Sequence, residues 1–536
     1  MNLCLDHARV WLGGHHFAEA VLFDRQRILH VGSRSEVRAL LGPSDEVIDC
    51  GGRLVLPGFN DTHLHLYNKG FALQNVELRD CRSISEVVER CRRELELRPE
   101  YHFQILRGRG WNDELLEEKR CLTRRDLDQI CRHIPVILTR VCGHIACVNS
   151  CALQRLGMSE SAPVMEGGQI DCDENGRPTG IFRENALDLL QQLDPPLSAQ
   201  DIRKRLTLAM EEAAKAGLTS VHSNDVQPGM TEMMMESWFQ LRQQEAMPVR
   251  VTMQCTLPQP ELLQSFLDRG WVSGYGDEVL RIGPLKLLVD GSLGARTAWL
   301  RQPYADDPSQ RGIATFTQDQ LQTLLTMAQK AGMQIACHAI GDAAIESVLN
   351  GYRKINGDQG NVRRHGIVHC QITDEALLRR FQKEQIAALV QPIFLHADQH
   401  IAQRRVGKAL AAHSYAFKTM ADSGVPVSFG TDCPVEELNP FENLYCALTG
   451  KDLDHPQAQP WHPQECFELC QALECYSAAG AWLSFEEQIK GRIRPGMLPD
   501  FTICDQDLFA IPASQVRHVR SWMTISQGKM TWRTEH

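Results

Sequence analysis

Short apolar stretches alternate with amphipathic stretches along most of the chain, a pattern typical of strands followed by helices. Eight stretches are apolar and β-rich, and most of them are followed by a helical repeat. This alternation is expected for parallel strands wound with helices. The predicted strands cover residues 54–66, 219–223, 249–256, 284–290, 334–339, 365–371, 387–391 and 427–432. Eight is the number of strands that closes a (β/α)8 barrel.

The two ends of the chain have a different pattern, with short strands separated by glycine and polar turns. Neither end is long enough to bury a core of useful size by itself. We therefore expect residues 1–58 and 480–536 to fold together as a composite β-sandwich. The predicted barrel domain then occupies residues 59–479.

An unusually long segment, residues 67–216, separates the first predicted barrel strand from the second. An ordinary crossover needs far fewer residues. The segment contains its own apolar strand at 134–140 and amphipathic helices at 84–97 and 197–215. We interpret it as an inserted subdomain.

Composition and charge exclude several classes of protein. The 536 residues are 43% hydrophobic, which predicts a folded chain with a large core. Basic residues number 56 against 67 acidic ones, and no stretch forms a basic stripe, so nucleic acid is excluded as a partner. Asp6 and Arg9 interrupt the first apolar stretch, and no run of about 18 apolar residues occurs. We expect no membrane association, and the 19 cysteines, without a C-x-x-C pair, predict reduced thiols in the cytoplasm.

The motif PGFNDTHLHL, residues 57–66, carries the strongest chemical signal. His63 and His65 lie two residues apart at the end of a predicted strand. Because positions i and i+2 of a strand face the same side, both imidazoles can reach one metal ion. An isolated H-x-H is also common as a structural or surface feature, so the rest of the barrel decides between the two interpretations.

Four further candidate ligands lie on predicted strands, namely Lys286, His338, His369 and Asp432. Three of the four are at or near the carboxyl end of their strand. Each has a simpler interpretation, since a buried histidine is often only hydrogen-bonded and an aspartate before Cys-Pro can cap a turn. The active sites of such barrels lie at the carboxyl ends of the strands. Six potential ligands converging on that face predict a metal centre.

These motifs resemble the metal-dependent amidohydrolase superfamily, and within it the YtcJ-like branch that includes N-substituted formamide deformylases. Besides PGFNDTHLHL, the resemblance rests on RGWND (109–113), Gly143-His144 with VNS (148–150), GIFRE (180–184), DGSLGARTA (290–298), Pro303-Tyr304, Asp306-Asp307, His338-x-x-Gly-Asp342, GTD (430–432) and GRIRPGMLPDF (491–501). The match covers essentially the whole chain. It implies a distorted TIM-like barrel, a composite β-sandwich, an insertion after strand one and a divalent metal centre, usually zinc.

The resemblance also implies roles for individual residues. His63 and His65 match the strand-one ligands, His338 and His369 those of strands five and six, and Asp432 the acid of strand eight. Lys286 matches a lysine that can be carbamylated to bridge two metal ions, so the centre holds one or two. A lysine among leucines is costly to keep charged, and its neutral amine can add CO2. An ion pair between Lys286 and Asp290 is the alternative.

Catalytic and substrate-binding roles follow from these positions. A metal-activated water would lose its proton to Asp432, which would return it to the leaving nitrogen, and His338 or His144 would stabilise the oxyanion. The candidate substrate-binding residues are Trp111, His144, His222, Asp290 and Arg296. Packing by Trp111 and loop fixation by Arg296 are equally good interpretations. Cys142 stands where relatives commonly have aspartate, which argues against transferring a named activity.

The sequence therefore predicts a zinc-dependent hydrolase of a non-peptide C–N bond in a small-molecule amide or cyclic amide. Esters and lactones are alternative substrates for the same centre. A binding or regulatory protein on the same barrel is the alternative from another class, although no predicted ligand is missing. The assembly is left open between a monomer and a homodimer, the commonest soluble oligomer.

Overall fold

The computed structural model describes residues 2–97, 104–142, 144–163, 165, 167–194 and 196–534. The chain forms two compact units, a larger one of Met1–Lys69 with Leu206–His536 and a smaller one of Gly70–Arg205. It passes between them within α2 (Leu66–Leu73) and α6 (Ala199–Lys215). Among the described residues, no helix combines the length and the apolarity needed to cross a bilayer.

The larger unit contains a nearly closed barrel of eight parallel strands, which confirms the predicted fold class. The strands are fully buried or nearly so, as expected when helices cover the outside of a parallel sheet. Thr62 on the first strand donates a hydrogen bond to the carbonyl of Phe429 on the last at 2.9 Å and brings the two edges together. In spatial order the strands are β8 (Phe59–Leu64), β15 (Leu218–Val226), β16 (Arg250–Thr256), β17 (Leu280–Leu288), β18 (Ile335–Ala339), β19 (Gly366–His369), β20 (Ala387–Val390) and β21 (Val427–Phe429).

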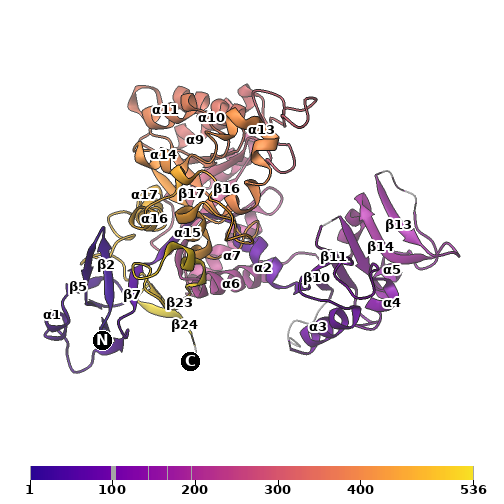
Figure 1. Cartoon of the computed structure of the whole chain (residues 1–536), viewed down its shortest axis with the longest axis horizontal. Helices are drawn as coiled ribbons and strands as arrows, with labels where there is room; N and C mark the ends of the chain where they lie inside the picture. The colour runs from indigo at the N-terminus through magenta and orange to yellow at the C-terminus, as the bar shows by residue number, and fades with distance from the viewer. Residues whose placement is uncertain are drawn as a thin grey trace. The chain divides into compact units, whose positions relative to one another are not determined.

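Helices follow most of these strands in the chain (Figure 1). They are amphipathic and bury their apolar side chains, as Leu321, Leu324 and Leu325 do in α9. The longer helices of this unit are α7 (Thr231–Gln243), α8 (Pro260–Asp268), α9 (Gln318–Ala331), α10 (Asp342–Asn356), α11 (Glu375–Glu384), α13 (Ala402–Ala411) and α15 (Pro440–Thr449). The shorter ones are α1 (Arg34–Arg38), α12 (Leu395–Asp398), α14 (Phe417–Asp422), α16 (Leu469–Cys475) and α17 (Ala478–Leu483).

Two further sheets of the larger unit are built from the two ends of the chain, and strands from both ends lie together in Figure 1. One has the order β5-β4-β1-β6 and the other β24-β23-β22-β7-β2-β3. Their bounds are β1 (Leu3–Asp6), β2 (Arg9–Gly13), β3 (His16–Ala18), β4 (Ala20–Phe23), β5 (Ile28–Gly32), β6 (Glu46–Asp49), β7 (Leu54–Pro57), β22 (Phe501–Cys504), β23 (Ser521–Ser526) and β24 (Lys529–Arg533). One hydrophobic core joins the two ends, with Val21 and Phe23 among its members beside Phe501 and Met523.

The predicted single strand at 54–66 is wrong, because the structure divides it into two strands in different sheets. β7 pairs with β22 and β2, whereas β8 pairs with β15 of the barrel. The change of sheet occurs at Gly58, where a Cβ atom would lie 2.0 Å from the Oγ1 atom of buried Thr219. Only glycine leaves room for this close approach of the two strands.

We therefore expect Gly58→Ala to destabilise the larger unit by about 1–3 kcal/mol through overpacking. The measurement is the shift in melting temperature relative to the unaltered protein. Gly42→Ala is the matched control, since its added Cβ would make only an ordinary contact of 3.6 Å with Asp45. Equal melting temperatures for the two variants would contradict the steric argument.

The smaller unit is a six-stranded mixed sheet with hydrophobic clusters on both faces. Leu138 belongs to one cluster and its neighbour Ile137 to the other, as the alternation of a strand requires. In spatial order the strands are β13 (Gly168–Cys172), β14 (Pro178–Glu184), β12 (Ile145–Val148), β11 (Val136–Arg140), β10 (Leu106–Trp111) and β9 (Val76–Glu77). The helices are α3 (Ile84–Leu97), α4 (Arg124–Leu127) and α5 (Ser150–Arg155).

Candidate metal centre

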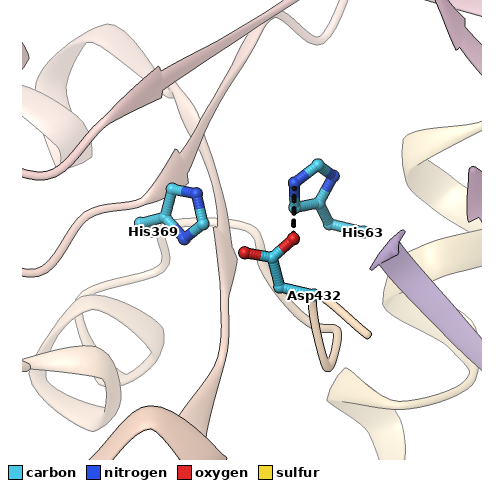
Figure 2. Close-up of side chains that lie close together, drawn as sticks. All are labelled: His63, His369 and Asp432. Carbon is cyan, nitrogen blue, oxygen red and sulfur yellow. Dashed lines mark ion pairs between the residues drawn. The ribbon is translucent and has the colours of Figure 1, made fainter. Parts of the chain in front are cut away.

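Donor atoms from several barrel strands meet at the carboxyl ends of these strands. His63 is near the end of β8, His369 is the last residue of β19, and Asp432 follows β21. One donor atom from each lies within 4.8 Å of the others, and all three residues are buried. Figure 2 shows both imidazoles beside the carboxylate. Groups distant in the sequence thus form one compact set of nitrogen and oxygen donors.

Two more of the predicted ligands join this set. The Nε2 atom of His65 lies 3.0 Å from Oδ1 of Asp432, and Nε2 of His63 lies 3.3 Å from the same oxygen. The ammonium nitrogen of Lys286 is 3.3 Å from Nε2 of His63. Lys286 therefore faces the cluster, whereas the carboxylate of Asp290 accepts backbone N–H groups from the loops after β17 and β18. The structure does not support the predicted alternative of a Lys286–Asp290 ion pair.

Two glutamine side chains fix the tautomers of the buried imidazoles. Oε1 of Gln254 is 2.7 Å from Nδ1 of His63, and Oε1 of Gln391 is 2.7 Å from Nδ1 of His369. Each amide nitrogen donates to a backbone carbonyl, at 3.0 and 3.2 Å, which fixes the orientation of both amides. Since an amide oxygen only accepts, Nδ1 of each histidine must carry the proton. Nε2 of both rings therefore keeps a lone pair.

The other two predicted histidine ligands are held by backbone carbonyls. Nδ1 of His65 donates to the carbonyl of Asn224 at 3.0 Å, so Nε2, which lies beside Asp432, is the nitrogen that can bind a metal ion once it has lost its proton. Nε2 of His338 donates to the carbonyl of Gly291 at 3.0 Å, so its lone pair is on Nδ1. The His338 ring lies 4.4 Å from that of His369, centroid to centroid, and His338 is not one of the three residues of the compact donor group. All four imidazoles thus present a nitrogen able to bind a metal ion.

Burial controls the protonation of the cluster. It lowers the pKa of Lys286 to about 7, although the negative charge of Asp432 acts to raise this pKa. Burial and then the nearby positive charges lower the pKa values of His63 and His369. For His65, burial also lowers the pKa, but the hydrogen bond and charge of Asp432 outweigh it and the net shift is upward. Burial therefore favours the neutral forms of Lys286, His63 and His369, which bind metal ions or CO2, whereas Asp432 favours the protonated form of His65.

The backbone around the cluster is strained. His369 and Asp432 have φ angles of 82° and 56°, in the left-handed region that side chains other than glycine seldom adopt. The carboxylate of Asp61 helps to hold this arrangement, because it accepts hydrogen bonds from Thr431 and from the backbone N–H of His63. Burial raises the pKa of Asp61 to about 7. Strain of this kind is typical of functional sites.

The residues predicted to contact substrate in the larger unit have structural partners. Asp290 is engaged by three backbone N–H groups, including that of Gly341 at 2.8 Å. Arg296 forms an ion pair of 3.1 Å with Asp306, which also pairs with Arg405. Both contacts hold loops that follow β17, and for Arg296 this favours the loop-fixing interpretation.

His222 is the middle residue of β15, and its side chain is buried. Burial and the charge of Lys490 lower the pKa of His222 to about 3. Lys490 also donates to Ser220, near the start of β15, and pairs with buried Glu486. Lys490 therefore lies toward the amino end of β15, whereas the metal cluster lies at the carboxyl ends of the strands. The predicted contact between His222 and substrate stays a prediction.

Two further predicted substrate-binding residues belong to the smaller unit. Trp111 is completely buried in its core, and the indole N–H donates to a backbone carbonyl of β11 at 2.9 Å. This position gives Trp111 a packing role within its own sheet. His144 is exposed, with Nδ1 3.0 Å from a carboxylate oxygen of Glu184. Cys142 is exposed as well, and Gly143 lies outside the described residues.

Sequence reasoning missed the residues that support the ligands. Gln254 and Gln391 orient imidazoles, and Asp61 holds the backbone of two ligand segments. A signal for Gln254 was present, because Thr252, Gln254 and Thr256 alternate with apolar residues on a strand that is buried on both faces. Polar residues at every second position of such a strand indicate its interior face.

The fold and this donor set define a TIM-barrel hydrolase of the metal-dependent class. The chain belongs to the Amidohydrolase family, whose sequence profile matches residues 46–531. It is 31% identical to YtcJ of Bacillus subtilis (strain 168), over 98% of this chain and 99% of that protein. It is 26% identical to the N-substituted formamide deformylase of Arthrobacter pascens, over 96% and 95%. An uncharacterized metal-dependent hydrolase from Pyrococcus furiosus has a similar crystal structure, with a TM-score of 0.77 and 28% identity over 95% of this chain and 99% of that one.

We expect Gln254→Met and Gln391→Met each to weaken metal binding by about 10- to 100-fold, because the imidazole tautomers are no longer fixed. The measurement is a competition titration against a chromophoric chelator. Gln382→Met, at an exposed position of α11, is the control and should bind metal as tightly as the unaltered protein. Unchanged affinity in both interior variants would show that the glutamines do not orient the ligands.

Proposed function

We propose that this protein hydrolyses a non-peptide C–N bond in a small-molecule amide or cyclic amide. The reaction would depend on a divalent metal ion, and zinc is the proposed metal. The observation that carries the proposal is the compact, buried donor set of His63, His369 and Asp432 at the carboxyl ends of the strands. Imidazole and carboxylate are the ligands of catalytic zinc, and the fixed tautomers leave each imidazole with a free lone pair.

The proposed ligands are the six groups predicted from the sequence: His63, His65, Lys286, His338, His369 and Asp432. Lys286 would take part as its carbamate. A neutral amine reacts with CO2, and the pKa of about 7 makes this form available near neutral pH. The product is an anion with two oxygen donors, so the site has the groups to hold either one or two ions.

The residues of this chain would move the proton and orient the reactants. A bound divalent ion supplies activation of water and polarisation of a carbonyl group. The carboxylate of Asp432, within 3.3 Å of two imidazoles, would accept the proton of the attacking water and then deliver it to the leaving nitrogen. His338, fixed through Gly291 at the edge of the cluster, would orient the substrate or stabilise the developing oxyanion.

Similarity supports the class of bond more than any particular substrate. The Arthrobacter pascens relative is named for deformylation of N-substituted formamides, which is cleavage of a C–N bond. Esters and lactones are the alternative substrates, since the same groups serve acyl transfer to water. A non-catalytic binding protein is the second candidate, but the complete donor set disfavours it. None of the 19 cysteines, all of which are among the described residues, forms a disulfide, which supports the proposal of a cytoplasmic location.

The test combines metal analysis with a substrate panel. Protein produced with zinc and bicarbonate should hold about one or two equivalents of metal in the catalytic centre and should hydrolyse at least one member of a panel of N-substituted formamides and cyclic amides. Removal of metal by a chelator should abolish this turnover, and added zinc should restore it. A metal-loaded protein that is inactive on amides, esters and lactones alike would favour the binding protein. Failure to take up metal would reject the metal-dependent hydrolase and leave the binding protein as the alternative.

A further inference from the structure

A second group of metal-ligand side chains lies outside the proposed catalytic centre. Three histidines surround the carboxylate of Asp452, whose side chain is 2% exposed. Nδ1 of His396 is 2.9 Å from Oδ1, while Nε2 of His400 and Nδ1 of His455 are 2.6 and 2.9 Å from Oδ2. None of the motifs that define the family resemblance includes these residues.

The two oxygens of Asp452 have different surroundings. Oδ1 is held by His396 and by the backbone N–H of Asp454 at 2.7 Å, which fixes the plane of the carboxylate. Oδ2 is presented to His400 and His455, whose side chains are 56% and 71% exposed. One donor atom each from Asp452, His400 and His455 lies within 4.8 Å of the others. A buried, oriented carboxylate thus meets two imidazoles that solvent can reach.

We propose that His400, His455 and Oδ2 of Asp452 form a second site for a divalent transition-metal ion, with Zn2+ as the preferred ion. Two imidazoles and one carboxylate are a common protein ligand set for zinc, and water completes the coordination. Ligand atoms that share such an ion lie about 3 Å apart, close to the separations found here. His396 acts as a positioning residue, because its contact with Oδ1 leaves Oδ2 free to bind the ion.

The location of this site indicates what a bound ion would do. His400 follows α12, which continues directly from Phe394, and the ring of Phe394 stacks on His369 of the catalytic cluster at 5.8 Å. Asp452 and His455 belong to the loop after α15. An ion at this site would therefore link the segment that follows Phe394, beside the proposed ligand His369, to the loop after α15. Because the ion binds only the folded arrangement, it raises the stability of the larger unit.

The test compares zinc binding by three proteins that carry no histidine tag. One is the unaltered chain, one is His400→Ala/His455→Ala, and the control is His15→Ala/His518→Ala, which also removes two exposed histidines. After dialysis against buffered zinc, the first double variant should contain about one equivalent less zinc than the unaltered chain and the control. Added zinc should also raise its melting temperature less.

A second variant, Asp452→Asn, keeps the size of the side chain and removes its charge, and it should lose the same equivalent of zinc. Because Gln254, Gln391 and the catalytic ligands are unchanged, the remaining zinc reports the catalytic centre separately. Equal zinc content and equal thermal response in all four proteins would overturn the proposal and leave the cluster as a hydrogen-bonded group of histidines around one carboxylate.

Discussion

Asp432→Asn is expected to lower turnover of any amide substrate by about 10²- to 10⁴-fold, the usual contribution of a general acid–base group. The amide of asparagine keeps the size of the side chain but cannot accept a proton from water. The fold should persist, because the loop is also held by the Asp432 backbone N–H, which donates to the carbonyl of His63 at 2.7 Å, and by Asp61 with Thr431.

The measurement is kcat/KM for the best substrate of the panel, with metal content determined on the same sample. Asp505→Asn removes one carboxylate from an exposed position and should leave both quantities unchanged. Retention of activity in Asp432→Asn would remove this residue from the catalytic role. A parallel loss of activity and metal would instead make Asp432 mainly a ligand.

Lys286→Ala is expected to have the second-largest effect. If the lysine binds metal as its carbamate, the metal affinity of the variant should fall by more than about 10- to 100-fold, which is the loss typical when a residue that only supports a ligand is removed. Activity should fall with it. Short-chain carboxylates such as acetate or propionate should restore part of both, because they place two anionic oxygens in the space that the side chain leaves.

Lys286→Met is the matched control for this rescue. Methionine fills most of the space of the buried lysine, so added carboxylates should have no effect. Rescue of the alanine variant alone would support the carbamate. Loss of activity that no carboxylate restores would indicate that Lys286 acts as an amine, for which its 3.3 Å contact with His63 provides the partner.

Much of the fold could be predicted because buried parallel strands leave a strong apolar signal. The strands predicted at 387–391 and 365–371 include β20 (Ala387–Val390) and β19 (Gly366–His369). The exception at 54–66 has a physical reason. A run that is buried throughout looks like one strand, and the change of sheet at Gly58 depends on the close approach of Thr219, about 160 residues away.

The ligands of the proposed centre could also be predicted from the sequence, whereas the residues that orient these ligands could not. His63, His65, Lys286, His369 and Asp432 follow from residue types on predicted strands and from the family resemblance, and the structure brings all five together. The substrate-binding predictions were weaker, because burial and pairing cannot be read from residue type. Buried Trp111 is an example, since a tryptophan packed in a core and one lining a pocket look alike in the sequence.

The sequence by itself determined the barrel, the family and the kinds of atoms available to a metal ion, because these depend on local patterns that repeat along the chain. Only the tertiary structure decided which nitrogen of each imidazole keeps its lone pair, how far the pKa of Lys286 falls, and that Asp452 gathers three histidines. These properties depend on burial and on hydrogen bonds between residues far apart in the chain, and both exist only after folding.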